Sequence, residues 1–298
     1  MTHHLTITSA ANPRVRAAAR LREADARRTT GLTLIDGGRE VRRAVAAGIP
    51  FEELFIDQEL FLRPEGAGQA SHDADATGIP SGEALETWLD DLAGRGTTIV
   101  ILARAAFEKI AFGNRNEGCV GVARFTVPAL DIWQVDRDLP VLILEGVEKP
   151  GNLGAILRTA DAAGLGGVLV CDGRTDPANP ATIRASLGTV FSVPMATGTT
   201  IETIRWCATT SRRVIAARPG GSTPWHAAKL AGRTAILLGS EAHGISPEWQ
   251  AAADAGEIVL DSVHLPMHGA ADSLNVSATA AVLAYESLRQ HGAGRGSP

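Results

Sequence analysis

The sequence contains no long apolar run. No stretch of about 18 apolar residues occurs, so we expect no transmembrane helix. The first residues, MTHHLTITSAANPRVR, lack the apolar segment that a secretory signal needs, and we therefore expect a cytoplasmic protein. Cys119, Cys171 and Cys207 are isolated and odd in number, which suits a reducing compartment and provides no framework of metal ligands. Tyr285 is the only tyrosine, which disfavours a platform of stacked aromatic side chains for RNA.

Positive charge is present but unevenly distributed. The 298 residues are 45% hydrophobic and 20% charged, as in a globular chain of about two domains. The net charge of −5 argues against a nucleic-acid partner when it is taken alone. Between Arg14 and Arg43, however, nine arginines face four acidic residues, a balance of +5 that leaves −10 for the rest. This asymmetry indicates a phosphate-binding surface, with a solvated arginine-rich helix as the alternative. The candidate RNA-binding residues are Arg14, Arg16, Arg20 and Arg22.

Segments with strand and helix patterns alternate along the chain, which predicts two α/β units. Residues 1–127 form the first unit, and within it residues 64–82 are rich in Gly, Ala, Asp and Ser and predict a loop or insertion. A linker is expected over residues 128–139. Residues 140–298 form the second unit, where apolar runs at 141–144 and 235–238 predict buried strands.

The first of three polar turns follows the strand predicted at 141–144. It has the sequence KPGNLG over residues 149–154, and Arg158 stands on the helix that begins there. Glycine lets a backbone approach a partner closely, and a guanidinium near a helix start can bind phosphate in bidentate fashion. An ordinary strand-to-helix turn is the alternative for this segment alone. The order of its glycines is not the GxGxxG dinucleotide fingerprint, although Asp172 stands where a ribose-binding acid would be expected.

The second and third turns lie towards the end of the chain. Gly239-Ser240-Glu241 follows the apolar run 235–238, and Glu241 can accept a hydrogen bond from an amine or a hydroxyl. The third turn runs from Leu265-Pro266-Met267 to Ser273-Leu274-Asn275, after which apolar residues at helical spacing predict a closing helix with Ser273 as its N-cap. Each turn alone is explained by a loop or a cap. Together, at the ends of strands, they indicate one ligand pocket.

In this order, the three turns resemble the motifs of the SpoU (TrmH-like) family of RNA ribose 2′-O-methyltransferases, in the SPOUT class. The resemblance covers residues 141–289 by motif. More loosely it covers the first unit, where Asn12-Pro13 and Leu34-Ile35-Asp36-Gly37 are similar to a ribosomal-protein-like RNA-binding domain. The family more often has Glu at the position of Asp36, and often has Asp-Pro where Lys149-Pro150 stands.

The resemblance implies a parallel α/β catalytic domain with a deep trefoil knot, a homodimer, S-adenosylmethionine as cofactor, and no metal. A guanidinium has a pKa of about 12 or higher, so we interpret Arg158 as a phosphate anchor or proton relay rather than a free base. The catalytic residues implied are Asn152, Arg158, Glu241, Ser273 and Asn275. The cofactor-binding residues implied are Leu238, Gly239, Glu241, Leu265, Met267, Ser273, Leu274 and Asn275.

Several functional alternatives follow from these observations. RNA is the expected substrate, and by analogy with the family 23S rRNA is favoured over tRNA because a separate RNA-binding unit precedes the catalytic one. Methylation that confers antibiotic resistance is a further possibility within the same reaction. A non-catalytic RNA-binding protein with a relic donor pocket is a second class, which the intact motif residues disfavour. A nucleotide-dependent oxidoreductase is a third class, which the missing glycine fingerprint disfavours.

Overall fold

The structure, a computed structural model, describes residues 4–62, 80, 83–112 and 117–294. Its contacts divide the chain into two units, one of residues 1–126 with 178–191, the other of residues 127–177 with 192–298. The loop expected at 64–82 lies outside the described residues apart from residue 80. Among the described helices, none combines the length and apolar character that crossing a membrane requires.

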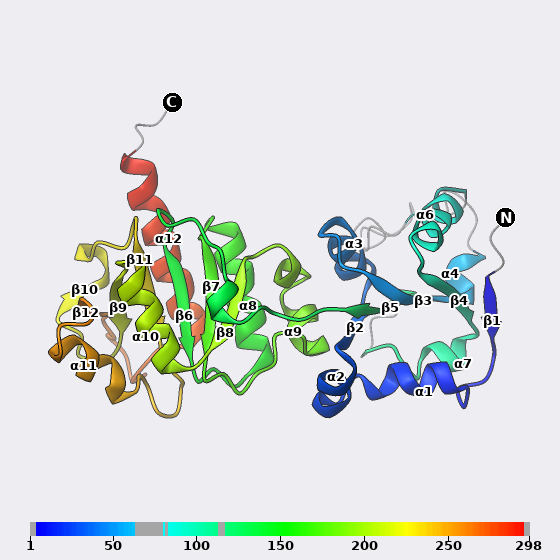
Figure 1. The fold of residues 1–298 in the computed structure, drawn as a ribbon, viewed down its shortest axis with the longest axis horizontal. Helices are drawn as coiled ribbons and strands as arrows, with labels where there is room; N and C mark the ends of the chain where they lie inside the picture. The colour runs from blue at the N-terminus through cyan, green and yellow to red at the C-terminus, as the bar shows by residue number, and fades with distance from the viewer. Residues whose placement is uncertain (1–3, 63–79, 81–82, 113–116, 295–298) are drawn as a thin grey trace. The chain divides into compact units, whose positions relative to one another are not determined.

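The first unit contains a five-stranded mixed sheet in the order β1-β4-β3-β5-β2 (Figure 1). Strand β4 is parallel to both β1 and β3, whereas β5 is antiparallel to β3 and β2. The strands are β1 Leu5–Ile7, β2 Leu32–Asp36, β3 Phe51–Asp57, β4 Thr98–Leu102 and β5 Cys119–Arg124. The helices are α1 Pro13–Arg20, α2 Ala24–Thr30, α3 Gly38–Ala46, α4 Gln58–Phe61, α6 Glu83–Gly94, α7 Arg104–Phe107 and α9 Pro180–Ala185, with a 3-10 turn η2 at Thr189–Phe191.

Helix α1 begins where the sequence provides a cap. The Asn12 side chain accepts a hydrogen bond from the backbone N–H of Arg14, and Pro13 occupies the first helical position, where its missing N–H costs nothing. Val15 and Ala18 are buried on the inner face of the helix. The arginines of α1 therefore lie on its outer surface.

Helix α9 lies between β7 and β8 in sequence, yet it belongs to the first unit. The Arg184 guanidinium donates to the Asp36 carboxylate at 2.8 Å, at the end of β2. Arg43 of α3 donates to the carbonyl oxygen of Leu187 at 2.9 Å. The sequence alone assigns residues 178–191 to the 140–298 unit, because nothing in a helix of six residues identifies the surface against which it packs.

Asp36 is buried beside this segment, and burial raises the pKa of its carboxyl from 3.8 to about 6. The hydrogen bond from the Phe112 N–H, 2.6 Å long, and the positive charge of Arg184 both act in the opposite direction. Desolvation outweighs them because the carboxylate is removed from water.

The second unit contains a seven-stranded sheet in the order β10-β12-β9-β11-β6-β7-β8, with every neighbouring pair parallel. The strands are β6 Val141–Glu145, β7 Gly167–Cys171, β8 Met195–Gly198, β9 Arg213–Ala217, β10 Thr223–Pro224, β11 Thr234–Leu238 and β12 Leu260–His264. The helices are α8 Pro150–Ala162, α10 Thr200–Thr209, α11 Pro247–Asp254 and α12 Val276–Gly294, with 3-10 turns η1 Leu130–Ile132 and η3 Trp225–Ala227.

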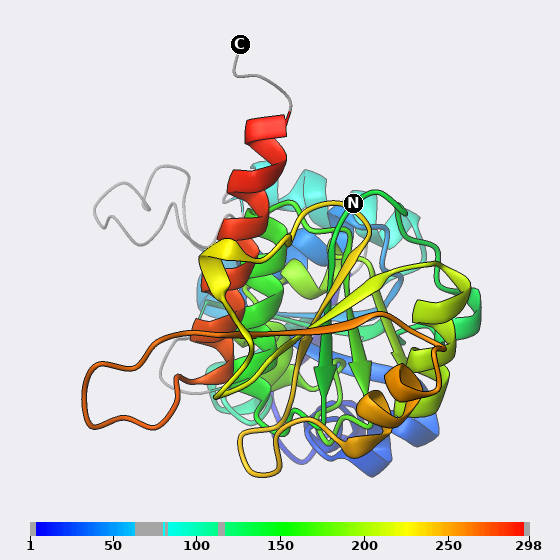
Figure 2. The same cartoon turned by 90° about the vertical axis from the view of Figure 1, so that its left-hand side faces the viewer.

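Helices cover both faces of this sheet. Helices α8 and α12 pack together on one face, and α10 and α11 contact each other on the opposite face (Figures 1 and 2). Val141 and Ile143 of β6 join a core cluster with Trp249 of α11. All five residues of β6 are buried, which explains the continuous apolar run in its sequence. The expected parallel α/β sheet is confirmed.

Several local expectations are corrected. Helix α12 begins at Val276, and Asn275 rather than Ser273 caps it, because the Asn275 side chain accepts from the Ser277 N–H at 2.9 Å. Strands β8 and β10 and helix α11 were not expected, and each is short with a weak apolar pattern. The stretch expected as a linker packs on the second unit, where Leu130 and Trp133 are buried in its core.

Candidate active site

The loops after β6, β11 and β12 leave the seven-stranded sheet at one edge, because parallel strands end together. Strand β6 leads to α8 on one face, whereas the adjacent β11 leads to α11 on the other. Neighbouring strands whose connections leave in opposite directions open a crevice, which is the usual ligand site of such sheets. The three turns singled out from the sequence all lie at this edge.

Three predicted catalytic side chains meet in one polar cluster at this edge. The Asn152 amide donates to the Glu241 carboxylate. The side-chain Nδ2 of Asn275 lies 3.3 Å from both the side-chain Oδ1 of Asn152 and Glu241 Oε1. One residue from each turn therefore contributes to the cluster, and two amides hold the carboxylate of Glu241.

Lys149 also reaches this cluster. Its Nζ lies 3.6 Å from Glu241 Oε2, and its side chain is 71% exposed. Lys149 is the N-cap residue of α8, where its side chain makes no capping hydrogen bond. From the sequence, Lys149 stands out only as a departure from the family's usual Asp-Pro, one that bears on rate or substrate, and it has no assigned contact.

Arg158 lies on α8 with its side chain exposed. Within the described part of the chain, no hydrogen bond or ion pair engages its guanidinium, and none joins it to Asn152. The family resemblance also implies that Asn152 orients Arg158, and no direct hydrogen bond between the two residues is seen here. The guanidinium is available to a ligand that is itself anionic.

A cavity of about 480 Å³ opens among the loops after β9, β11 and β12. Small-molecule sites usually fall within this range of volume. Seven of the eight residues expected to bind the cofactor line it, namely Leu238, Gly239, Glu241, Leu265, Met267, Ser273 and Leu274. Asn275, the eighth, contacts Glu241 instead of lining the cavity.

Two glycines allow the loops around the cavity to approach each other closely. A Cβ on Gly239 would lie 2.2 Å from the carbonyl oxygen of Gly244, within the tight turn closed by paired hydrogen bonds between Ser240 and Gly244. A Cβ on Gly221 would lie 2.4 Å from the backbone of Val263. Only glycine permits these approaches, so the loops stay close and leave room for a ligand.

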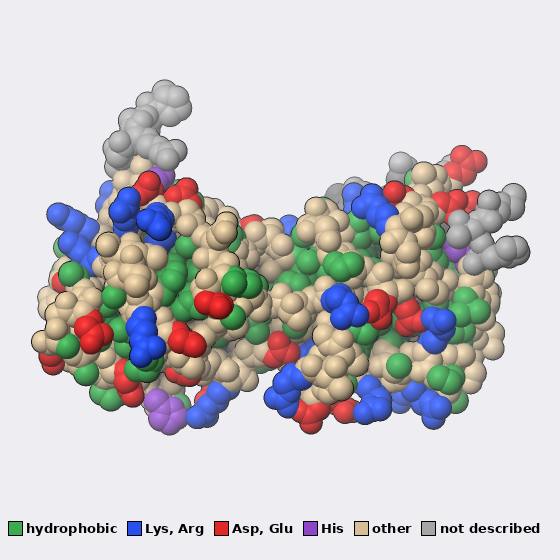
Figure 3. All heavy atoms as spheres, viewed as in Figure 1, with side chains coloured by type: hydrophobic (Ala, Val, Ile, Leu, Met, Phe, Trp, Pro, Cys, Tyr) green, Lys and Arg blue, Asp and Glu red, His purple; other side chains and the backbone are tan. Residues whose placement is uncertain are grey.

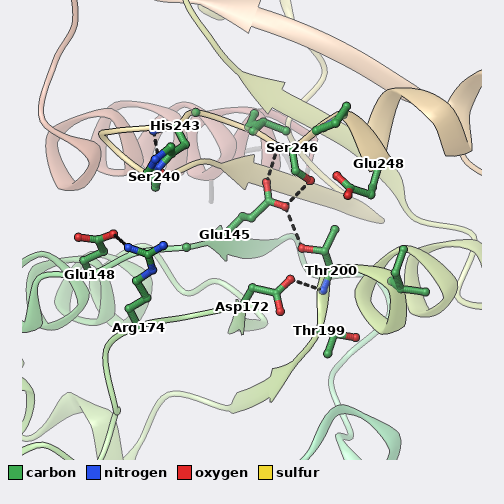
Figure 4. A pocket seen from close by; sticks show the side chains of 15 residues that line it. Glu145, Glu148, Asp172, Arg174, Thr199, Thr200, Ser240, His243, Ser246 and Glu248 are labelled. Atoms are coloured by element: carbon green, nitrogen blue, oxygen red, sulfur yellow. Dashed lines mark hydrogen bonds and ion pairs between the residues drawn. The ribbon is translucent and has the colours of Figure 1, made fainter.

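A second hollow, of about 630 Å³, lies on the other side of the 240–246 loop (Figure 4). Glu145, at the end of β6, accepts hydrogen bonds from the Thr200 hydroxyl at 2.8 Å and from the Ser246 N–H at 2.9 Å. Asp172 accepts from the Thr200 N–H at 2.9 Å. These carboxylates accept hydrogen bonds from backbone N–H groups at the N-terminal ends of α10 and α11, where negative charge is favourable. They thereby fix the loop that separates the hollow from the smaller cavity.

The sequence analysis missed part of the cavity wall. Arg218, Pro219 and Gly220 follow β9 and line the cavity beside the expected residues. His264 also lines it, and its Nδ1 lies 2.7 Å from the Gly221 carbonyl oxygen. The run of Arg-Pro-Gly-Gly after an apolar strand was an available signal, because such turns end strands at a ligand-binding edge. The described residues contain no cluster of three or more potential metal ligands of the His, Cys, Asp and Glu types.

The four arginines expected to bind RNA have different surroundings in the first unit. Arg14 forms an ion pair with Glu53. Arg22 donates to the Ala111 carbonyl oxygen at 2.7 Å. Arg16 and Arg20 are exposed and have no partner among the described residues. Figure 3 shows several basic side chains along the part of the first unit where α1 and α2 lie.

Comparison with known proteins matches both parts of the chain to family models. Residues 140–285 match the SpoU rRNA Methylase family, and residues 12–121 match the MRM3-like substrate binding domain. The 23S rRNA (guanosine-2'-O-)-methyltransferase RlmB of Bordetella pertussis is 31% identical over 211 residues, which are 69% of this chain and 84% of that protein.

Two solved structures resemble the whole fold. One is an RNA 2'-O ribose methyltransferase with 33% identity and a TM-score of 0.76, over 96% of this chain and 99% of that one. The other is an AdoMet-bound rRNA methyltransferase from Sinorhizobium meliloti with 25% identity and a TM-score of 0.79, over 96% of this chain and 97% of that one.

Proposed function

Since the chain belongs to the SpoU rRNA methylase family, we propose that it methylates a ribose 2′-hydroxyl of 23S rRNA. It is an RNA ribose 2′-O-methyltransferase that uses S-adenosylmethionine. The observation that carries the proposal is the meeting of Asn152, Glu241 and Asn275 at the edge of a cavity large enough for that cofactor. The residue roles that follow are part of the proposal.

The cavity fits the cofactor chemically. Leu238, Leu265, Met267 and Leu274 give its wall an apolar character suited to an adenine ring, and the half-buried backbone of Gly239 is assigned to hydrogen bonds with the cofactor. Glu241 provides negative charge near a ligand whose sulfur is positive. When bound, the cofactor supplies a methyl group on a sulfonium that is its own leaving group. The protein therefore contributes mainly position and charge.

We assign Arg158 to the phosphate beside the target ribose, because its guanidinium is exposed and engaged by no described residue. A bidentate contact there holds the ribose in register with the cavity and favours loss of the hydroxyl proton through nearby positive charge. Asn152 and Asn275 hold the Glu241 carboxylate in place. Ser273, at the cavity wall, is assigned to a hydrogen bond with substrate or cofactor.

The first unit is assigned to RNA binding through the exposed arginines of α1. Arg16 and Arg20 carry the larger share, because Arg14 and Arg22 are engaged within the unit. We place the protein in the cytoplasm, with its ribosomal substrate. A role in antibiotic resistance would follow if the methylated nucleotide lay in a drug site.

A homodimer is part of the proposal. Tyr285 and Leu288 of α12 are 52% and 39% exposed, and α12 packs against α8, which carries Arg158. Covering these apolar side chains with a second copy would place another chain beside the site. The trefoil knot of the C-terminal segment also stays a prediction.

The test combines cofactor binding with substrate mapping. Calorimetry should detect S-adenosylmethionine binding to the wild type, and 2′-O-methyl mapping of rRNA from cells with and without the protein should reveal one gained site. Leu274→Asp should weaken cofactor binding, because Leu274 lines the cavity, and it should leave the fold intact, because this side chain is 42% exposed. Val259→Asp, at an exposed apolar residue absent from the cavity lining, is the control.

The remaining outcomes separate the alternatives. Cofactor binding without any transferred methyl group would favour the relic pocket. A methyl group found on tRNA instead of 23S rRNA would change the substrate but keep the reaction. Binding of NAD in place of S-adenosylmethionine would contradict the proposal.

A further inference from the structure

Lys149 occupies a position where a lysine does not serve the fold. It is the N-cap of α8, with φ of −91° and ψ of 121°, and Pro150 follows it at the first helical position. N-cap side chains stabilise a helix by accepting a hydrogen bond from a free backbone N–H, which an ammonium cannot do. Its positive charge also opposes the positive end of the helix dipole.

Three other helices are capped through side-chain oxygens, whereas α2, α3, α7 and α11 lack a side-chain capping hydrogen bond, as α8 does. Asn12 caps α1 and Asn179 caps α9 through their side-chain oxygens. Thr199 caps α10 and forms a reciprocal capping box with Glu202. Positions where a local rule is broken are characteristically functional ones. Among the α-helices whose N-caps are described, only α8 has a cationic N-cap residue, and this residue lies beside the residues assigned to catalysis.

The ion pair with Glu241 does not account for the lysine. Its Nζ–Oε2 distance of 3.6 Å exceeds a hydrogen bond, and the Lys149 side chain is 71% exposed. An ammonium has three N–H donors, so those not directed at Glu241 remain open to solvent or to a ligand. Glu241 therefore holds the ammonium near the polar cluster and leaves some of its N–H donors available to a ligand.

The local charges point to an anionic partner. Lys149 and Arg158 stand on the same helix, both exposed, and Arg158 has no protein partner among the described residues. RNA has a phosphate on each side of every ribose, so a chain that brings a 2′-hydroxyl to the cavity also brings phosphates to its rim.

We propose that Lys149 binds an RNA phosphate adjacent to the target ribose and so positions its 2′-hydroxyl. This inference rests on the proposed function. Lys149 is a second cationic contact, nine residues before Arg158 in the sequence, and Glu241 holds its ammonium near the polar cluster. A lysine at the N-cap lowers helix stability but adds a contact to the substrate. Replacing it with a capping residue should therefore raise stability and lower RNA affinity.

The experiment measures both properties in the full-length protein. Lys149→Ser supplies a capping hydroxyl and removes the charge, Lys149→Arg keeps the charge, and Lys229→Ser removes another exposed lysine distant in sequence from the motifs. Thermal unfolding reports stability. Binding to a 23S rRNA transcript over a range of salt concentrations reports phosphate contacts, and calorimetry reports S-adenosylmethionine affinity.

Lys149→Ser should not lower the unfolding midpoint and should raise it by up to about 2 °C. Cofactor affinity should stay unchanged. Its RNA affinity should fall roughly tenfold, and the slope of log K against log salt should become shallower by about 0.7 to 0.9. Lys149→Arg should keep the wild-type slope, and Lys229→Ser should match the wild type throughout.

Two results would overturn the inference. One is a Lys149→Ser protein with unchanged RNA affinity and salt slope, whatever its stability. The other is a Lys149→Arg protein that loses RNA affinity as Lys149→Ser does, since charge would then not be the cause. Failure of the proposed function looks different, because the wild type itself would then neither bind the cofactor nor methylate RNA.

Discussion

The two units differ in where their unengaged arginines lie. Both units hold other arginines in ion pairs, such as Arg184 with Asp36 in the first unit and Arg174 with Glu148 in the second. In the first unit, Arg16 and Arg20 of α1 are exposed and have no partner among the described residues. In the second unit Arg158 stands exposed beside an open cavity, without a described partner. The number of arginines therefore overstates the RNA-binding capacity of the first unit, and a single free guanidinium can matter more than several paired ones.

The largest expected effect comes from Arg158 in the second unit. Arg158→Ala should lower kcat by about 10² to 10⁴-fold, because it removes charge and position at the reacting ribose, while cofactor affinity stays unchanged. Single-turnover methylation of the mapped rRNA measures the loss. Arg205→Ala, at an exposed arginine on α10, is the control. Normal turnover of Arg158→Ala would remove this residue from the mechanism.

The next effect concerns a paired arginine of the first unit. Arg184→Ala should reduce the free energy of unfolding by about 3 kcal/mol, because it leaves the buried Asp36 carboxylate without its cation. Hydrogen exchange of β2 and α3 locates the loss, and chemical denaturation measures it. Arg174→Ala breaks an exposed pair with Glu148 and should cost less than about 1 kcal/mol. Equal losses in both variants would contradict the contrast between buried and exposed pairs.

A double substitution on α1 tests the same contrast for RNA. Arg16→Ala with Arg20→Ala should weaken binding of a 23S rRNA transcript about tenfold and make its salt slope shallower by about 1.5, because both side chains are free. Filter binding over a range of salt concentrations measures both quantities. Arg14→Ala with Arg22→Ala is the matched control, expected to affect stability more than binding. The reverse ranking would show that the internal contacts open when RNA binds.

The smallest expected effect is a pH dependence. Burial raises the pKa of Asp36 to about 6 in the folded protein from 3.8, so the folded state binds its proton more tightly than the unfolded chain does. The resulting stability is fully present below pH 3.8 and is lost as the pH rises through about 6. Between pH 7 and pH 5 the gain is on the order of 1 kcal/mol.

Denaturation profiles of the wild type and of Asp36→Asn isolate this contribution. The asparagine variant should lack the rise that Asp36 causes between pH 7 and pH 5. Identical pH profiles would mean that the carboxyl is not the titrating group.

The sequence predicted best those features that depend on local pattern. Strands β6 and β11 contain continuous apolar runs buried on both faces, so the sequence pattern alone identified them. The turns that follow parallel strands meet at one edge of the sheet, and this is why Asn152, Glu241 and Asn275 were grouped correctly before the fold was known.

What the sequence did not predict depends on partners that lie far away in the chain. Asp36 and Arg184 are 148 residues apart, and no local pattern indicates that they pair. The cap of α12 fell on Asn275 instead of Ser273 because the turn continues past the first candidate oxygen. Helix α11 was missed because its eight residues, PEWQAAAD, bury only Trp249 and Ala252.

The first unit is built from two separate segments of the chain, and this determines when it can finish folding during translation. Residues 178–191 complete this unit, yet residues 127–177 must be translated before them. At about 5 to 20 residues per second, the nascent first unit waits roughly 3 to 13 s for the helix that carries Arg184. During that interval the carboxyl of Asp36 lacks its ion pair with Arg184. A protein truncated after residue 126 never receives residues 178–191. Expressing the first unit by ending the chain at its first boundary therefore leaves this unit incomplete.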